Sequence, residues 1–144
     1  MALPGSVLFA CTLNSIRSPI AEAIFKHLHG QRIFVDSVGL KADEVDPLAV
    51  EVMAEIGIDI HAHRPKTFDE LADSSFDVIV TLSPEAQHRA VEMTRIMACD
   101  VEYWQTFDPT ALEGSREQRL TAYRQVRDSL LRRIRERFPP KPQA

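Results

Sequence analysis

The chain has 144 residues, the size of one compact domain, and a formal charge of −4 at neutral pH. Apolar residues make up 44% and charged residues 26%, as in ordinary soluble proteins, and no apolar run approaches the roughly 20 residues of a membrane span. The composition therefore predicts no membrane segment, and the acidic charge argues against a nucleic-acid binder. Residues 1–10 lack the basic start and long apolar core of a secretory signal, so we expect a cytoplasmic location.

Apolar runs alternate with helical patterns along the chain. Strands are predicted at 7–10, 33–39, 76–82 and 100–104. Helices are predicted from near Pro19 to Gly30, over 46–57 with Asp46 as cap, from Ser83 onward, and from a capping box at Ser115 and Gln118 to Pro139. This order predicts an α/β fold, a three-layer sandwich with a four-stranded parallel sheet, whose ligands bind beyond the carboxyl ends of the strands. We expect a single domain over 1–140 and a frayed tail at 141–144.

Cys11 ends the first predicted strand, and residues 12–17, TLNSIR, lead into the first helix. A loop in this position aims several backbone N–H groups and the positive end of the helix dipole at one point, which favours an anion. Arg17 can close that ring with two parallel hydrogen bonds to phosphate-type oxygens. The same field stabilises a thiolate, so the pattern favours Cys11 as a nucleophile over a packing residue.

Two more side chains of this loop have expected roles. Asn14 is expected in the left-handed conformation, because a tight anion nest needs one such residue and the loop has no glycine. Ser18 either donates to the Cys11 thiolate or caps the helix, and the sequence favours neither role. The predicted phosphate-binding residues are Thr12, Leu13, Asn14, Ser15, Ile16, Arg17 and Ser18.

The segment VLFACTLNSIRSPIAEAIF, residues 7–25, resembles the start of the low-molecular-weight protein tyrosine phosphatases, which share their fold with thioredoxin-type arsenate reductases. The second signature of that family is an Asp-Pro pair, matched here by Asp108-Pro109. The resemblance implies four parallel strands with helices on both sides and a phosphate-binding loop between the first strand and the first helix. It also implies that Asp108 protonates the leaving group and later activates water, a role that carboxyl groups can perform in both directions. Taken alone, an aspartate before proline is more often a turn residue.

The resemblance also suggests supporting residues outside the loop. The loop asparagine of the family is held by polar groups beneath it, and Ser37 resembles the serine that does this. Some members have a supporting histidine near the positions of His61 and His63, for which we expect a surface role here. No metal or other cofactor is implied.

The chain departs from the phosphatase pattern at the wall of the substrate cleft. Thr110 and Ala111 stand where animal phosphatases of the family have two tyrosines that form one wall of the phosphotyrosine cleft. Tyr103 and Trp104 either replace those rings or belong to the core. Leu13 replaces a common glycine, which would reshape the rim.

The chain also departs from the reductase pattern, because reductases use further cysteines to resolve the oxidised intermediate. Ser83 follows the third strand where such a cysteine is typical, and Cys99 is the only other thiol. Ile16 replaces a second loop cysteine of many family phosphatases, so an internal disulfide that protects the nucleophile is not expected.

The residues and the resemblance together predict a metal-independent phosphatase of phosphate monoesters that acts through a phosphocysteine. Its expected substrate is protein phosphotyrosine or a small aryl phosphate. One alternative is an arsenate reductase that uses an external thiol or Cys99, and another is a non-catalytic module that binds oxyanions or phosphotyrosine. We expect a monomer or a weak homo-oligomer.

Overall fold

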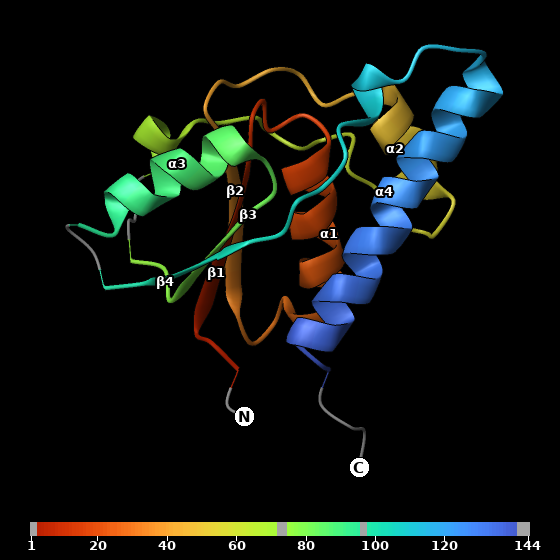
Figure 1. Ribbon diagram of the computed structural model, residues 1–144. Coiled ribbons are helices and arrows are strands. Elements are labelled where there is room, and N and C mark those ends of the chain that lie inside the picture. The colour runs from red at the N-terminus through yellow and green to blue at the C-terminus, as the bar shows by residue number, and fades with distance from the viewer. Residues whose placement is uncertain (1–2, 72–74, 96–97, 141–144) are drawn as a thin grey trace.

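The computed structural model describes residues 3–71, 75–95 and 98–140, and the expected tail at 141–144 lies outside this part. Four parallel strands form one sheet in the order β2-β1-β3-β4 (Figure 1). The strands are β1 (Ser6–Cys11), β2 (Phe34–Gly39), β3 (Val78–Thr81) and β4 (Asp100–Tyr103). The helices are α1 (Arg17–His29), α2 (Pro47–Ala54), α3 (Pro84–Met93) and α4 (Arg116–Arg137), with short 3-10 turns η1 (Phe68–Glu70) and η2 (Pro109–Ala111). The predicted α/β sandwich is confirmed.

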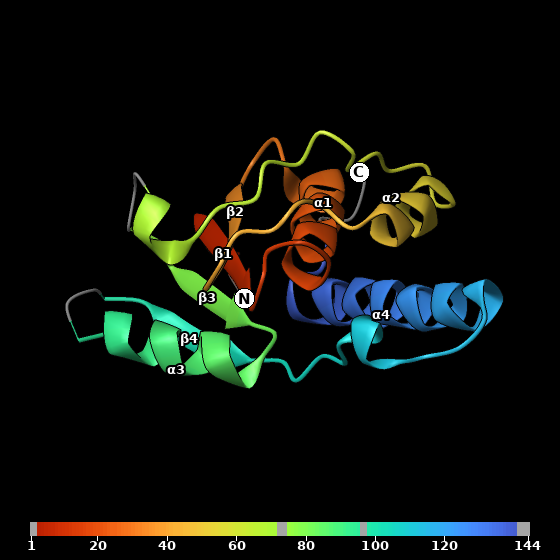
Figure 2. The same cartoon turned by 90° about the horizontal axis from the view of Figure 1, so that it is seen from above.

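Helices cover both faces of the sheet (Figure 2). Side chains of β1 alternate between two apolar cores, as the two-residue period of a strand requires. Val7 and Phe9 pack with residues of α1, α2 and α4, whereas Leu8 and Ala10 pack with residues of α3 and η1. None of the described helices combines the length and the apolar character needed to cross a membrane.

Helices α2, α3 and α4 begin where the sequence predicts them, because capping side chains satisfy their first N–H groups. Asp46 accepts from the N–H of Leu48 at 2.8 Å at the start of α2, and Ser83 accepts from Ala86 at the start of α3. The expected capping box of Ser115 and Gln118 opens α4.

Arginines of α4 fix α2 against the rest of the molecule. Arg124 and Arg127 both donate to the Glu55 carboxylate, each at 2.8 Å. Arg127 also donates to the carbonyl of Val52 at 2.8 Å. The hydrogen bonds from the two arginines lower the pKa of Glu55 to about 2. These two arginines of α4 therefore serve to hold α2.

The carboxyl ends of the four strands meet at one edge of the sheet, where Cys11 is in register with Gly39 at the end of β2. The loops that follow β1, β2, β3 and β4 consequently converge above this edge (Figure 1).

Candidate active site

The loop between β1 and α1 curls around Cys11. Asn14 has φ of 54°, so the expected left-handed residue is confirmed. This conformation turns the backbone N–H of Asn14 inward, where it lies 3.3 Å from Cys11 Sγ. Gly39 lies directly below, and a Cβ atom there would come within 2.7 Å of the Asn14 nitrogen. The end of β2 must therefore be glycine for the loop to approach so closely.

The side chain of Asn14 is completely buried and uses all its hydrogen-bonding capacity. Its Nδ2 donates to Ser18 Oγ at 2.8 Å and to Ser37 Oγ at 3.0 Å. Its Oδ1 accepts from the backbone N–H of Lys66 at 2.9 Å and from His63 Nε2 at 3.1 Å. The asparagine is thus held from below by three different segments of the chain.

His63 belongs to this buried network, so the expectation of a surface role is wrong for it. To donate to Asn14, its Nε2 must carry a proton, which the neutral imidazole can provide. Burial lowers the pKa of His63, against an opposing contribution from the Glu22 charge. His61 is exposed and pairs with Asp59 at 2.7 Å, as a surface residue does.

Ser37 connects this hydrogen-bond network to helix α1. Its hydroxyl donates to Glu22 Oε1 at 2.5 Å, and Glu22 Oε2 pairs with Lys26 at 2.7 Å. Glu22 is 8% exposed and was not identified from the sequence. Its only sequence signal is its polarity on the inward face of α1, one turn after Ser18.

Ser18 is the second residue of α1, and the position before the helix is occupied by Ile16 without a side-chain cap. The capping role that the sequence left open is therefore wrong. The Ser18 hydroxyl lies 2.9 Å from Cys11 Sγ and 3.3 Å from the carbonyl of Val38. Because Asn14 donates to the Ser18 oxygen, the single hydroxyl proton of Ser18 has two acceptors within reach, the Cys11 sulfur and the carbonyl of Val38.

A segment after β2, which we call the strap (residues 41–46), holds the outer side of the loop. Three of its N–H groups donate to loop carbonyls, each at 3.0 Å: Lys41 to Thr12, Asp43 to Leu13, and Asp46 to Ser15. Asp46 is itself held by the Tyr123 hydroxyl of α4, which donates to its Oδ2 at 2.9 Å. Burial and the neighbouring Asp46 carboxylate raise the pKa of Tyr123. These three loop carbonyls are thereby occupied by the strap.

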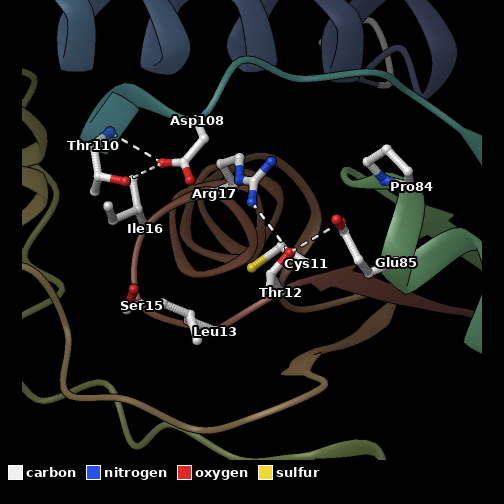
Figure 3. A pocket seen from close by; sticks show the side chains of 10 residues that line it. All are labelled: Cys11, Thr12, Leu13, Ser15, Ile16, Arg17, Pro84, Glu85, Asp108 and Thr110. Atoms are coloured by element: carbon white, nitrogen blue, oxygen red, sulfur yellow. Dashed lines mark hydrogen bonds between the residues drawn. The ribbon is translucent and has the colours of Figure 1, made fainter. Parts of the chain in front are cut away.

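A pocket of about 330 Å³ opens above the sulfur (Figure 3). Its lining residues are Cys11, Thr12, Leu13, Ser15, Ile16, Arg17, Pro84, Glu85, Asp108 and Thr110. The structure thus brings most of the expected phosphate-binding loop together with the distant Asp108, while Asn14 and Ser18 lie beneath the pocket.

Arg17 is 9% exposed, and backbone carbonyls position its guanidinium. Nη1 donates to the carbonyl of Thr106 at 3.1 Å and to that of Leu82 at 3.4 Å, and Nη2 donates to Thr12 Oγ1 at 3.4 Å. The two carbonyl partners follow β3 and β4, so these two strand ends hold the arginine beside the pocket.

Asp108 both closes a turn and lines the pocket. Its Oδ1 accepts from the N–H of Thr110 at 3.0 Å and from the Thr110 hydroxyl at 2.7 Å. These bonds fix the carboxyl group, whose second oxygen points toward the loop in Figure 3. The turn role and the active-site role, which were alternatives in the sequence, are compatible in the structure.

The aromatic candidates do not form a pocket wall. Trp104 packs in the core at 5% exposure, and Tyr103 is exposed on β4. Neither lines the pocket, whereas Thr110 does. Pro84 and Glu85 of α3 were missed as pocket residues, although residues that follow a parallel strand are expected at this edge of the sheet.

Cys99 lies at the opposite edge of the sheet from Cys11. The register aligns Val7 with Val78 and Val78 with Asp100. Cys99 is therefore about 16 Å from Cys11 along the strand direction alone, whereas the Cα atoms of a disulfide lie within about 7 Å. Burial and the Asp100 charge raise the pKa of Cys99. The suggestion that Cys99 resolves an intermediate on Cys11 does not fit this fold.

Within the ranges that the structure describes, no three His, Cys, Asp or Glu side chains are grouped so that they could hold a metal ion. The groups around Cys11 are instead hydrogen-bond donors, which suit an anion.

The comparisons with known proteins agree with this geometry. An arsenate reductase of Halalkalibacterium halodurans is 35% identical over 90% of this chain and 91% of its own. A solved low-molecular-weight protein tyrosine phosphatase from T. tengcongensis is 28% identical, with a TM-score of 0.73 over 90% of this chain and 94% of its own. YwlE arginine phosphatase, solved as a mutant with a phosphorylated active-site serine in place of cysteine, is 26% identical, with a TM-score of 0.73 over 91% of both chains. The model of the low molecular weight phosphotyrosine protein phosphatase family matches residues 6–138, and the chain belongs to that family.

Proposed function

We propose that the protein is a phosphatase that hydrolyses phosphate monoesters through a phosphocysteine at Cys11, with protein phosphotyrosine as its expected substrate. One observation carries the proposal: Cys11, Arg17 and Asp108, the three groups that this reaction needs, line one pocket. The relatives that carry phosphatase names support it as well.

In the first step the Cys11 thiolate attacks phosphorus, so an S–P bond forms as the P–O bond to the leaving group breaks. Asp108, protonated at this stage, gives its proton to the leaving oxygen. The loop amides and the Arg17 guanidinium bind the three non-bridging oxygens, where negative charge collects in the transition state.

In the second step the Asp108 carboxylate takes a proton from water as the water oxygen attacks phosphorus. The S–P bond breaks, inorganic phosphate leaves, and the thiolate of Cys11 is restored. The Ser18 hydroxyl, 2.9 Å from the sulfur, donates a hydrogen bond that stabilises the departing thiolate. The phosphorylated active-site serine of mutant YwlE supports a covalent intermediate at this position.

Hydrolysis of an aryl phosphate at mildly acidic pH tests the mechanism. Cys11→Ser should abolish release of inorganic phosphate, while Cys99→Ser, the matched control across the sheet, should keep it. Asp108→Asn should lower kcat by about 10²- to 10⁴-fold, the usual contribution of a general acid. Asp69→Asn, a change at an exposed aspartate of η1, should leave kcat unaltered.

Peptides with phosphotyrosine, phosphoserine or phosphoarginine define the substrate in the same assay. Phosphoarginine is included because a similar structure is an arginine phosphatase. A wild-type protein that releases phosphate from neither the phosphotyrosine nor the phosphoserine peptide would contradict the proposal, as would full activity in Asp108→Asn.

The second candidate function is arsenate reduction, favoured by the name of the 35% identical relative. Arsenate would esterify Cys11 with loss of water, and an external thiol would then attack the Cys11 sulfur. This attack forms a mixed disulfide and releases arsenite, so two electrons pass from two thiols to arsenic, and a second external thiol frees Cys11. Arsenate-dependent consumption of a small thiol, unaffected by Cys99→Ser, would favour this function over the phosphatase.

A third outcome is binding without turnover. Tight binding of phosphate or of a phosphotyrosine peptide, without release of inorganic phosphate or consumption of thiol, would identify a binding module.

A further inference from the structure

The pocket wall contains a carboxylate that the proposed reaction does not use. Glu85, the second residue of α3, lines the same pocket as Cys11 and Arg17. Its Oε2 lies 3.5 Å from Thr12 Oγ1. In Figure 3, Glu85 and Asp108 lie on opposite sides of the pocket, with Cys11 and Arg17 between them. Among the described residues no lysine, arginine or histidine forms an ion pair with Glu85.

Helix stability explains an acidic residue at this position only in part. A carboxylate in the first turn of α3 interacts favourably with the helix dipole. The same carboxylate, however, lies beside a site built for an anion and repels an approaching phosphate. A positive charge on the substrate, close to its phosphate, would turn this repulsion into attraction.

Two further features of the rim favour a substrate that carries positive charge beside its phosphate. Asp43 and Glu44 of the strap are exposed, and Asp43 donates its N–H to the carbonyl of the rim residue Leu13. The strap thus carries two exposed carboxylates on a segment bonded to the rim residue Leu13, although neither of them lines the pocket. The described lining residues include no aromatic side chain that could recognise a substrate by stacking on its ring.

We propose that Glu85 is a specificity residue that favours phosphorylated protein segments in which lysine or arginine flanks the phosphorylated residue. This inference rests on the proposed phosphatase function. Neighbouring Cα atoms in a chain are about 3.8 Å apart, so a flanking lysine can reach the rim while the phosphate occupies the loop. A charge on an exposed rim acts mainly on association and is screened by salt.

The test uses two peptides that differ only in the residues on either side of phosphotyrosine, lysine in one and glutamate in the other. The wild type should have the higher kcat/KM for the lysine peptide at low salt. Glu85→Gln should lower this preference by about two- to fivefold, as expected for an exposed ion pair, and 0.5 M NaCl should have a similar effect. Glu92→Gln is the matched control, an exposed glutamate two turns further along α3 that pairs with His88, and it should keep the preference.

Equal changes for both peptides in Glu85→Gln, or a wild type that prefers the glutamate peptide, would overturn the inference. Binding of the two peptides to Cys11→Ser, with and without Glu85→Gln, measures the same preference without turnover. A preference in binding with no hydrolysis by the wild type would refute the phosphatase function but support the role of Glu85. Hydrolysis by the wild type with no preference between the two peptides would support the phosphatase function and refute the role of Glu85.

Discussion

Replacement of Asn14 tests whether the buried network beneath the loop maintains the shape of the anion site. Asn14→Ala removes the acceptor for two donors, the Lys66 N–H and His63 Nε2. A buried donor left without a partner costs about 1–3 kcal/mol, and because both of these hydrogen bonds are only partly buried, a value in the lower half of the range applies, about 3 kcal/mol for the two together. Ser18 and Ser37 keep other partners and add little. Alanine at φ of 54° adds about 1–2 kcal/mol of backbone strain.

Asn14→Gly separates the backbone contribution from the hydrogen bonds. Glycine loses the same hydrogen bonds but adopts the left-handed conformation without strain. Glycine also has greater conformational freedom in the unfolded chain, which lowers the stability of this variant by about 0.4–1 kcal/mol. We therefore expect unfolding free energies about 4–5 kcal/mol below wild type for alanine and about 3.5–4 kcal/mol below it for glycine.

Urea unfolding at pH 7 measures both values, with an unchanged m-value as evidence that the unfolding transition is the same. If the proposed mechanism holds, both variants should also lose about 10²-fold in kcat, because the loop amides that it assigns to the transferred phosphoryl group move out of position. If the alanine and glycine variants have equal unfolding free energies, the left-handed backbone conformation is not the reason that this position requires asparagine. If both variants lie within 1 kcal/mol of wild type, the network does not determine the stability of the loop.

Two further predictions concern the supports of the loop. Because the pKa of His63 is lower in the folded protein, the unfolded chain binds more protons below pH 6.5, and stability should fall from pH 7 to pH 5.5. His63→Gln should flatten this part of the urea-derived profile and His61→Gln should not, so equal slopes in all three proteins would contradict the assignment. Tyr123→Phe should lower the unfolding free energy by about 1 kcal/mol in the same assay, since it removes one hydrogen bond to Asp46. No measurable loss would show that this bond does not stabilise the strap.

The parts of the site that the sequence predicts are those set by local structure. Cys11, Arg17 and Ser18 lie on one strand-to-helix connection, so their proximity follows from the eight consecutive residues 11–18. The left-handed Asn14 could be predicted for the same reason, because a loop without glycine leaves few alternatives. Asp108 required the resemblance to a family, since nothing local distinguishes it from a turn aspartate.

The parts that the sequence did not predict depend on contacts between distant segments. His63 reaches Asn14 across 49 positions, and no periodicity in its own segment indicates that its ring turns inward. Glu85 could have been proposed, since it follows a strand predicted to be parallel and buried. The distance between Cys99 and Cys11 can be predicted only from the register of three strands, which the apolar patterns do not specify.

The strap fixes the conformation of the anion site whether or not a ligand is bound. With their carbonyls bound on the outside, the peptide groups of Thr12, Leu13 and Ser15 cannot easily rotate when the pocket is empty. In the proposed reaction a phosphate then enters a ring of dipoles that is already oriented, so little reorganisation free energy is needed at the moment of binding or in the transition state. Substitutions in residues 41–46 can therefore alter the rate of the chemical step even though these residues do not contact the substrate.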